Sequence, residues 1–432
     1  MNQKLNHLLI NQFRQLWDKG FYHIFGASFL NKIIQFCASV LLVRIISKPL
    51  YGVWTYAENI LQFFLLLQGL GCVVGLLQFS SANHHDISKK YAYTRYTLII
   101  GIIVNSMIAF SIIMFYFFGK LAISESKQVL LFLCFFPLVN VVFDTLQIYF
   151  RSSFENKKFS LLTTVNSATF LIFSTSGAVF WGIYGIAVGR YMAVLISVVT
   201  GFYLLKPQLH SILKAKALSV SEKKEFLSFS VVSMFSNIFS SLLFLLDVFL
   251  IGLLLKDKTL VASYKIATII PFAMNFLPMT ILIYAYPYLV QSATDCDKVK
   301  KVFNKLITSL AIVNSFISLF CIIFAPMIIK IIFGRQFLDA VPSFRILMLA
   351  YFVIGTFRSP AGNTLNALKK VNYNLIIVIV TGFINIALDY FLIKLYGMQG
   401  AAITSLTVSV LSSIMAMVFI RITLKSGIRP TL

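Results

Sequence analysis

Four basic residues lie inside long apolar stretches of this 432-residue sequence: Lys32, Arg190, Lys265 and Arg358. A charged side chain at the centre of a bilayer costs about 2.5–3.5 kcal/mol on insertion scales, so such residues face a cavity or a charged partner rather than lipid. Lys32 and Arg358 lie near the middle of their stretches and are the clearest candidates for a functional site. For Lys265, nearer the end of its stretch, reaching out to the membrane surface is an equal alternative. Pairing with carboxylates is the alternative for the other three.

These basic side chains would suit an anionic cargo. If Lys32, Arg190 and Arg358 converge, with Lys265 as a fourth contributor, they form a cationic lumen. In such a lumen Arg binds a phosphate or diphosphate through two parallel hydrogen bonds, and Lys acts as a point charge. Neutral hydrogen-bonding side chains of the kind that sugars accept occur at Asn31, Gln35, Asn59 and Gln62. Together these residues predict a binding site for a phosphorylated saccharide.

Four acidic residues also fall within apolar stretches: Glu58, Asp144, Asp247 and Asp389. Asp247 could pair with Lys265, and Asp389, near the end of its stretch, is expected to be structural. Glu58, Asp144 and Asp247 are therefore the candidates for carrying a coupling ion, either H⁺ or Na⁺.

Motifs that would indicate an enzyme or a motor are absent from the sequence. It contains no GxxxxGK[ST] phosphate-binding loop, no metal-ligand constellation of suitable spacing, and no grouping of nucleophile, base and orienting carboxylate. We therefore expect no catalytic residue, no bound metal and no organic cofactor. The basic residues recur in short groups between apolar stretches, whereas a nucleic-acid binder would gather them on one face, so no nucleic-acid partner is expected.

Membrane-spanning helices must hold these residues. Hydrophobic residues make up 59% of the chain and charged residues 12%, too few to cover the surface of a soluble protein. With about 20 apolar residues per span, the sequence predicts an all-α integral membrane protein. Pro360, which follows Arg358 and Ser359, predicts a break beside the charge, because proline removes a backbone hydrogen bond. The twelve expected spans are 21–46, 53–79, 93–118, 128–150, 159–180, 183–205, 228–254, 262–290, 304–332, 344–367, 372–394 and 399–421.

The distribution of Lys and Arg places both termini in the cytoplasm. With this orientation the cytoplasmic segments hold more than twice as many Lys and Arg residues as the opposite side. Residues 1–20 are predicted to form an amphipathic helix on the cytoplasmic membrane surface, with a disordered tail as the alternative. The basic segment 206–225 is predicted to be a cytoplasmic linker between two six-helix lobes, 21–205 and 226–432.

A faint internal repeat supports two lobes. Phe118–Lys120 recurs as Phe333–Arg335, and Trp181–Ala187 recurs as Tyr396–Ala402; both pairs of segments have the same separation, close to half of the chain. Because each half has an even number of spans, the halves enter the membrane from the same side and form a parallel repeat. In such a protein the substrate is expected in a central cavity between the halves.

Several segments of the chain resemble a known family. Phe333–Leu347 is similar to the FG-x-x-F-x-x-A-x-x-x-x-x-x-L sequence of polysaccharide-biosynthesis flippases, as are Asn385–Ile393 and Tyr396–Ile403. Leu50-Tyr51-Gly52 is similar to the family's x-x-YG turn after the first span. With the twelve spans and the parallel halves, the resemblance covers nearly the whole chain. It points to the O-antigen (Wzx-type) and capsular flippases of the multidrug/oligosaccharidyl-lipid/polysaccharide exporter superfamily.

The resemblance implies a flippase that works by alternating access. Its cargo would be an undecaprenyl-diphosphate-linked oligosaccharide, an O-antigen or capsular repeat unit, moved from the inner to the outer leaflet of the bacterial cytoplasmic membrane. The implied partners are the lipid bilayer, a glycan polymerase and a chain-length regulator. Two alternatives stay open: a cation-coupled multidrug antiporter of the same superfamily, which would need a dominant acidic residue deep in a lobe, and a membrane-embedded glycan polymerase.

Overall fold

The computed structural model of the chain describes residues 21–83, 85–293 and 295–425. In these ranges the chain forms α-helices, short 3₁₀ and π segments and turns, without any β-strand. Helix occupies each of the twelve predicted spans, which confirms the all-α membrane fold. The amphipathic helix predicted for residues 1–20 lies outside the described residues.

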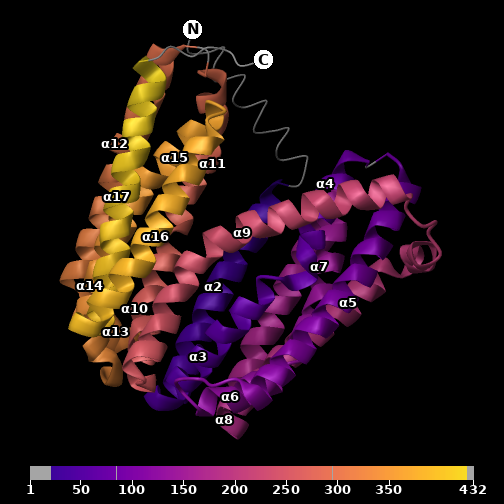
Figure 1. Cartoon of the computed structure of the whole chain (residues 1–432), viewed down its shortest axis with the longest axis horizontal. Coiled ribbons are helices and arrows are strands. Elements are labelled where there is room, and N and C mark those ends of the chain that lie inside the picture. Colours follow the sequence, from indigo (N-terminus) through magenta and orange to yellow (C-terminus); the bar gives the residue numbers. More distant parts are fainter. Residues whose placement is uncertain (1–20, 84, 294, 426–432) are drawn as a thin grey trace. The chain divides into compact units, whose positions relative to one another are not determined.

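The chain divides into two compact units, and the first contains the residues up to Ser47 together with Ile60–Ile238. The C-terminal part of α3 (Lys48–Leu65) and the N-terminal part of α9 (Val220–Leu255) belong to it. Figure 1 shows its helices mainly in indigo to magenta. Its other helices are α2 (Phe21–Ile45), α4 (Cys72–Ala82), α5 (Ile87–Phe118), α6 (Glu125–Phe132), α7 (Phe136–Ser152) and α8 (Asn156–Leu213).

The second unit contains Lys48–Asn59 and the residues from Phe239 onward, so the start of α3 belongs to it despite its place early in the sequence. The predicted linker 206–225 is helical at both ends, and only residues 214–219 connect α8 to α9. The remaining helices, pink through orange to yellow in Figure 1, are α10 (Lys258–Met274), α11 (Phe276–Gln291), α12 (Cys296–Ile323), α13 (Ala325–Ile332), α14 (Val341–Val353), α15 (Ser359–Ala367), α16 (Val371–Tyr396) and α17 (Met398–Lys425).

Several spans are bent or joined. In the described part of the chain, eight helical stretches are long and apolar enough to cross a membrane, and two bent pairs raise this number to ten. One bent pair is α3 with the segment Gln68–Ala82, at 48°, and the other is α6 with α7, at 47°. The 58-residue α8 is counted as one stretch. It nevertheless contains two predicted spans, because the chain turns within it at Trp181 and Gly182.

The internal repeat is confirmed by backbone geometry. Gly182 has φ 58° and ψ −135°, and Gly397, its counterpart in the repeat, has φ 62° and ψ −140°. Positive φ favours glycine because it has no Cβ. In each half the helix that follows then packs closely on the preceding one: a Cβ at Gly185 would lie 1.8 Å from the Gly177 carbonyl oxygen, and one at Gly400 2.0 Å from that of Leu392. The same helical hairpin therefore occurs in both halves.

Two of the segments that carry the family resemblance pack on each other within the second unit. The rings of Tyr51 and Phe337 meet edge to face at 6.5 Å. Nearby, Lys48 Nζ lies 2.7 Å from both carboxylate oxygens of Asp339. Gly52 lies so close to the backbone of α10 that a Cβ would be 1.8 Å from the Lys258 carbonyl oxygen. These contacts fix the start of α3 to the second unit.

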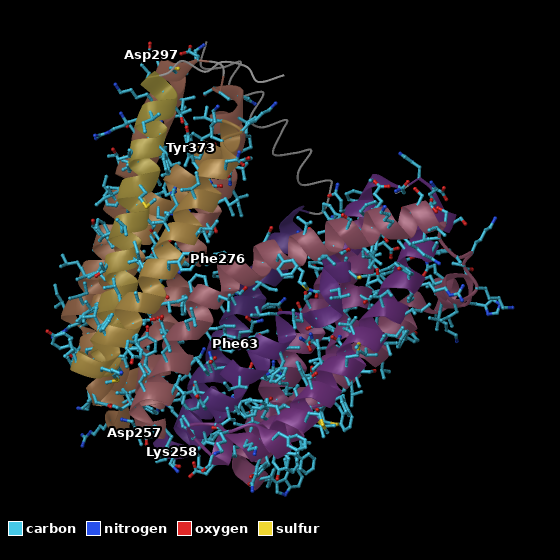
Figure 2. The ribbon with its side chains drawn as sticks, in the orientation of Figure 1. Phe63, Asp257, Lys258, Phe276, Asp297 and Tyr373 are labelled. Atoms are coloured by element: carbon cyan, nitrogen blue, oxygen red, sulfur yellow. The ribbon has the colours of Figure 1, made fainter. Side chains whose placement is uncertain are left out.

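The two ends of the second unit can be assigned to membrane sides. Figure 2 shows Asp257 and Lys258 at one end, and Asp297 at the other with Tyr373 in the same half. Asp297 lies in the first turn of α12, in a segment that the Lys and Arg distribution places in the cytoplasm. With this predicted orientation, the Asp257 end is expected to be the outer one.

Candidate functional site

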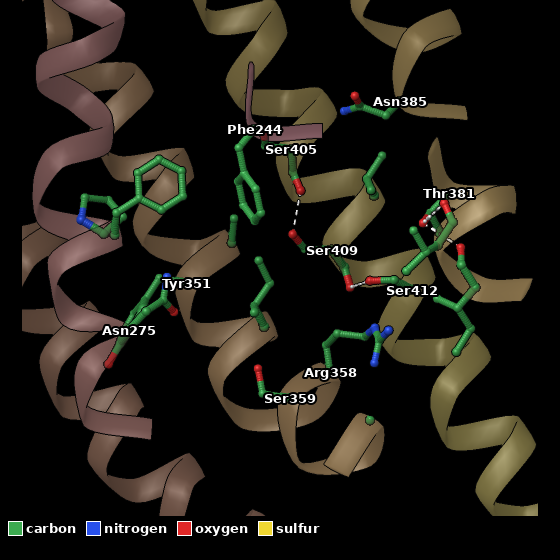
Figure 3. A pocket seen from close by; sticks show the side chains of 18 of the residues that line it. Phe244, Asn275, Tyr351, Arg358, Ser359, Thr381, Asn385, Ser405, Ser409 and Ser412 are labelled. Carbon is green, nitrogen blue, oxygen red and sulfur yellow. Dashed lines mark hydrogen bonds between the residues drawn. The ribbon is translucent and has the colours of Figure 1, made fainter. Parts of the chain in front are cut away.

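A cavity of about 760 Å³ lies inside the second unit, between α9, α10, α14, α15, α16 and α17. The aromatic side chains of Phe244 and Phe272 form part of its wall, with their rings edge to face at 5.5 Å. Apolar side-chain atoms form most of the wall, and amide and hydroxyl groups lie among them (Figure 3). The polar side chains that line it include Asn275, Asn363, Asn366, Asn374, Asn385, Ser359, Ser405, Ser409, Ser412, Thr268 and Thr381. This mixture of aromatic and neutral polar groups suits a saccharide.

Interrupted helices line this cavity. Asn275 stands at the junction of α10 and α11. The span that contains Arg358 changes to a π-helix at Ile354–Arg358, directly before Ser359 and Pro360, so the predicted break takes the form of a local irregularity in a helical stretch that continues to Ala367. Irregular backbone at membrane depth is tolerated where it lines a cavity, and π segments are frequent at functional sites. The break therefore marks the cavity as a candidate site.

Arg358 contributes the positive charge of the cavity. Its Nη1 donates to Asn374 Oδ1 at 3.2 Å, and Asn374 Nδ2 donates in turn to Asn366 Oδ1 at 2.8 Å. Gly362 leaves room for the guanidinium, since a Cβ there would lie 2.5 Å from Nη1. Within the described ranges, no acidic side chain lies at ion-pair distance from Arg358. A guanidinium has five donors, so the group retains capacity to bind an anion.

Two carboxyl groups lie at another part of the same unit. Asp247, on α9, is 8% exposed and lines the cavity, and Asp389, on α16, is fully buried. Tyr264 donates a hydrogen bond to Asp247 Oδ2, and Ser405 Oγ donates to the same oxygen at 2.9 Å. The two carboxyl groups are close enough for the charge of one to act on the other. Two carboxylates so close cannot both be charged without a proton or cation between them.

One further buried oxygen, that of the Asn385 amide, belongs to a residue one helical turn from Asp389 on α16. Asp247 Oδ1, both carboxyl oxygens of Asp389 and Asn385 Oδ1 make no hydrogen bond in the part of the chain that the structure describes. Carboxylate and amide oxygens are suitable ligands for hard cations. Asp389 was expected to be structural, and its place beside Asp247 was missed. The i, i+4 spacing of Asn385 and Asp389 on one helix face was the signal available.

Lys265 does not pair with Asp247, contrary to one expectation from the sequence. The nearest acidic influence on Lys265 comes from Glu58, whereas Asp247 is bonded by Tyr264 and Ser405. Asn59, next to Glu58, donates to the Leu245 carbonyl oxygen at 3.1 Å and so ties α3 to α9. Neither Lys265 nor the α3 residues line the cavity.

The other predicted residues belong to the first unit. Asn31 Nδ2 donates to Thr163 Oγ1 at 3.2 Å, while Lys32 and Gln35 are exposed on the same helix, α2. The Arg190 guanidinium lies 4.1 Å from the centre of the Phe136 ring. Gln62, on α3, is also in this unit. Because Arg358 lies in the second unit, the convergence of Lys32, Arg190 and Arg358 stays a prediction.

Asp144 braces a broken span in the first unit. Its Oδ2 accepts hydrogen bonds from Gln68 Nε2 at 2.8 Å and from Asn140 Nδ2 at 2.9 Å. Gln68 begins the 3₁₀ turn between α3 and α4, where Leu70 has a positive φ of 50°. The amide of Gly69 donates to Asn105 Oδ1. The carboxylate therefore helps to hold the break, and its role as an ion carrier stays a prediction.

Comparisons with known proteins agree on a transporter. A family model described as Polysaccharide biosynthesis protein matches residues 41–342. Curated protein sequences give no match. The fold is similar to an inward-facing multidrug resistance MATE family transporter of the MOP superfamily, with a TM-score of 0.76, 12% identity and coverage of 93% of this chain and 96% of that chain. It is also similar to the lipid II flippase MurJ in an inward closed conformation, with a TM-score of 0.71, 16% identity and coverage of 92% and 87%.

A third similar structure is a MOP superfamily transporter from Pyrococcus furiosus, with a TM-score of 0.59, 13% identity and coverage of 93% of this chain and 96% of that chain. At these identities the likeness concerns the fold. The family and fold neighbours are transporters and flippases rather than enzymes. Since the family model covers most of the chain, this multi-pass membrane protein belongs to the polysaccharide biosynthesis protein family and has the fold of the MOP superfamily transporters.

Proposed function

We propose that the protein moves an undecaprenyl-diphosphate-linked oligosaccharide, an O-antigen or capsular repeat unit, from the inner to the outer leaflet of the bacterial cytoplasmic membrane. Alternating access of its two units would carry the cargo. The observation on which this rests is Arg358, a guanidinium without an acidic partner among the described residues, in a cavity with aromatic and neutral polar walls. A charged side chain at membrane depth without an opposite charge beside it is energetically costly, so such a residue indicates a binding site.

Arg358 would bind the diphosphate, and the amides and hydroxyls would bind the sugars. Two of the guanidinium's N–H groups can bond a phosphate in parallel, which fixes both its position and its orientation. Asn363 and Asn366 lie on α15, five and eight residues after Arg358. They would offer both donors and acceptors to a sugar attached to the diphosphate. Lys32 and Arg190 in the first unit are proposed to bind the same anionic headgroup.

The carboxyl pair is the proposed site of the coupling ion. Asp247 and Asp389 require a proton or a cation between them, and Asn385 offers one more unpartnered oxygen. H⁺ or Na⁺ bound there would neutralise the pair. Entry of this ion from the outside would then supply the energy for outward movement of the cargo. Interaction with a glycan polymerase and a chain-length regulator is part of the same proposal.

A cation-coupled multidrug antiporter is the second candidate function. One observation favours it: the buried pair of Asp247 and Asp389 supplies the acidic residues deep in a unit that an antiporter for cationic drugs would need. Resistance to toxic organic cations separates the two candidates. The antiporter predicts resistance in cells that express the protein and its loss in Asp247→Asn, whereas the flippase predicts no resistance.

Surface glycan is the test of the flippase. In a strain whose surface glycan depends on this protein, Arg358→Ala should reduce the glycan at least tenfold and cause the lipid-linked precursor to accumulate. Arg358→Lys keeps the charge but not the two parallel bonds, so it should retain part of the activity. Lys301→Ala is the matched control, because Lys301 is exposed at the cytoplasmic end of α12. Full glycan display by Arg358→Ala at normal protein level would refute the proposed role of the cavity.

A further inference from the structure

The cavity of the second unit connects Arg358 with the carboxyl pair. On α16 its lining extends from Val371 to Asn385, and the eleven positions from Asn374 to Asn385 correspond to roughly 16 Å along the helix axis. Arg358 is hydrogen-bonded to Asn374 at one end of this stretch. Asp247 lies at the other end, where Ser405 bonds to it. Figure 3 shows the same order, with Arg358 on one side of Ser409 and Ser405 on the other.

The end at Arg358 is the cytoplasmic one. Asn366 and Val371 line the cavity and are exposed on either side of the turn 368–370. Lys369 and Lys370 in this turn place it on the cytoplasmic side of the membrane. At the opposite end Asp389 is fully buried. An ion moving through this cavity between the carboxyl pair and the cytoplasm therefore passes Arg358.

Serine hydroxyl groups line the cavity between Arg358 and the carboxyl pair. Ser405, Ser409 and Ser412 follow one another along one face of α17. Ser409 Oγ donates to the Ser405 carbonyl oxygen at 2.6 Å, and Ser412 Oγ donates to that of Ser409 at 3.0 Å. A hydroxyl has two acceptor lone pairs and only one proton. Each of these oxygens can therefore also accept a bond from water or contact a small cation.

We propose that Arg358 is an electrostatic gate that blocks cation passage between the cytoplasm and the carboxyl pair. A guanidinium stays charged at any physiological pH. Among the described residues no acidic side chain lies close enough to offset this charge. A cation that moves through the cavity is therefore repelled by the full charge of the guanidinium. An arginine beside a narrow pathway excludes cations in the same way in channels. The inference rests on the proposed function for its cation site.

Such a gate would prevent the ion gradient from dissipating when no cargo is present. At an effective dielectric constant of about 20, repulsion between two unit charges about 4–10 Å apart slows passage by roughly tenfold or more. The size of this effect makes the gate measurable as an ion leak. The structure therefore predicts that neutralising Arg358 opens a leak that runs through Asp247.

Cation entry into proteoliposomes that contain the purified protein and no cargo is the test. An inward gradient of radioactive sodium, or of protons read by an internal dye, is imposed on wild type, Arg358→Gln, Arg358→Lys and the double variant Arg358→Gln/Asp247→Asn. We expect entry to be at least tenfold faster through Arg358→Gln than through wild type. Arg358→Lys keeps a positive charge and should behave as wild type, and the double variant should return to the wild-type rate.

Two results would overturn the gate: wild-type rates through Arg358→Gln, or a leak through Arg358→Gln that persists in the double variant. Size-exclusion profiles and melting temperatures establish that each variant is folded, and Arg358→Lys provides a folded comparison at the same position. The assay contains no lipid-linked saccharide. Transport of such a lipid is measured in a separate assay, and its absence in the wild-type protein would refute the proposed function. That result would not change the cation leak expected for Arg358→Gln.

Discussion

Replacing Arg358 with glutamine should make the protein more stable while it stops transport. A charge at membrane depth costs about 2.5–3.5 kcal/mol, and no acidic side chain in the described part of the chain offsets it. The substitution loses the hydrogen bond to Asn374 Oδ1, which at 3.2 Å is long for a charged donor and is worth about 1.5 kcal/mol, the low end for such bonds. The difference is a net gain of about 1–2 kcal/mol. For a unit of this size the gain corresponds to a rise of roughly 2–8 °C in melting temperature.

Thermal unfolding of the purified protein, followed by tryptophan fluorescence, measures this gain. Arg358→Lys retains the charge, so its melting temperature should stay near that of wild type. Lys301→Gln removes a charge from an exposed position on α12 and should also change little. A lower melting temperature for Arg358→Gln would refute the reasoning, because it would identify the guanidinium as a structural group whose bonds stabilise the fold.

Three further predictions concern other parts of the chain. Sodium at about 100 times its dissociation constant should stabilise the wild-type protein by about 2.7 kcal/mol, and Asp389→Asn should abolish this gain; equal gains in both proteins would exclude the carboxyl pair as the site. Gly52→Ala should destabilise the protein by about 1–3 kcal/mol, because its Cβ would lie 1.8 Å from the Lys258 carbonyl oxygen. Gly26→Ala, with nothing within 4 Å of its Cβ, is the control that should fold normally; equal melting temperatures would contradict the close packing. Hydrogen bonds from the Ser219 amide and hydroxyl hold the pKa of Glu222 below its usual 4.5, so their stabilisation is complete above pH 4.5 and is lost as the pH falls below it. Acid unfolding of Glu222→Gln should lack this component, and an unchanged acid profile would count against the cap.

The sequence was sufficient for the spans, the internal repeat and an irregular helix at Arg358. Each of these depends on local chemistry. A run of apolar residues is helical wherever it packs in a bilayer, and Pro360 disturbs its own helix regardless of its neighbours. The glycines at 182 and 397 are recognisable because the same turn is needed twice, and they occupy equivalent positions in the predicted repeat.

The carboxyl pair could not be predicted, because it depends on the register between distant helices. Asp247 and Asp389 are separated by about a third of the sequence, and which of several acidic residues faces Asp247 is decided by how α9 packs against α16 and α17. Lys265 is one residue from Tyr264, which does bond Asp247. Neighbouring residues on a helix point about 100° apart, so Lys265 points elsewhere and lies under the influence of Glu58. The packing of residues 48–59 with the second unit could not be predicted either, because it too depends on contacts with helices that are distant in the sequence.

Transfer of a lipid-linked oligosaccharide between the leaflets of proteoliposomes is the decisive test of the proposed flippase. The assay uses purified wild-type protein, Arg358→Ala and Lys301→Ala, with an undecaprenyl-diphosphate-linked oligosaccharide and an enzyme that acts only on glycan exposed at the outer surface. We expect transfer by wild type and Lys301→Ala, and at least tenfold slower transfer by a folded Arg358→Ala protein. Equal transfer by Arg358→Ala and wild type would contradict this proposal.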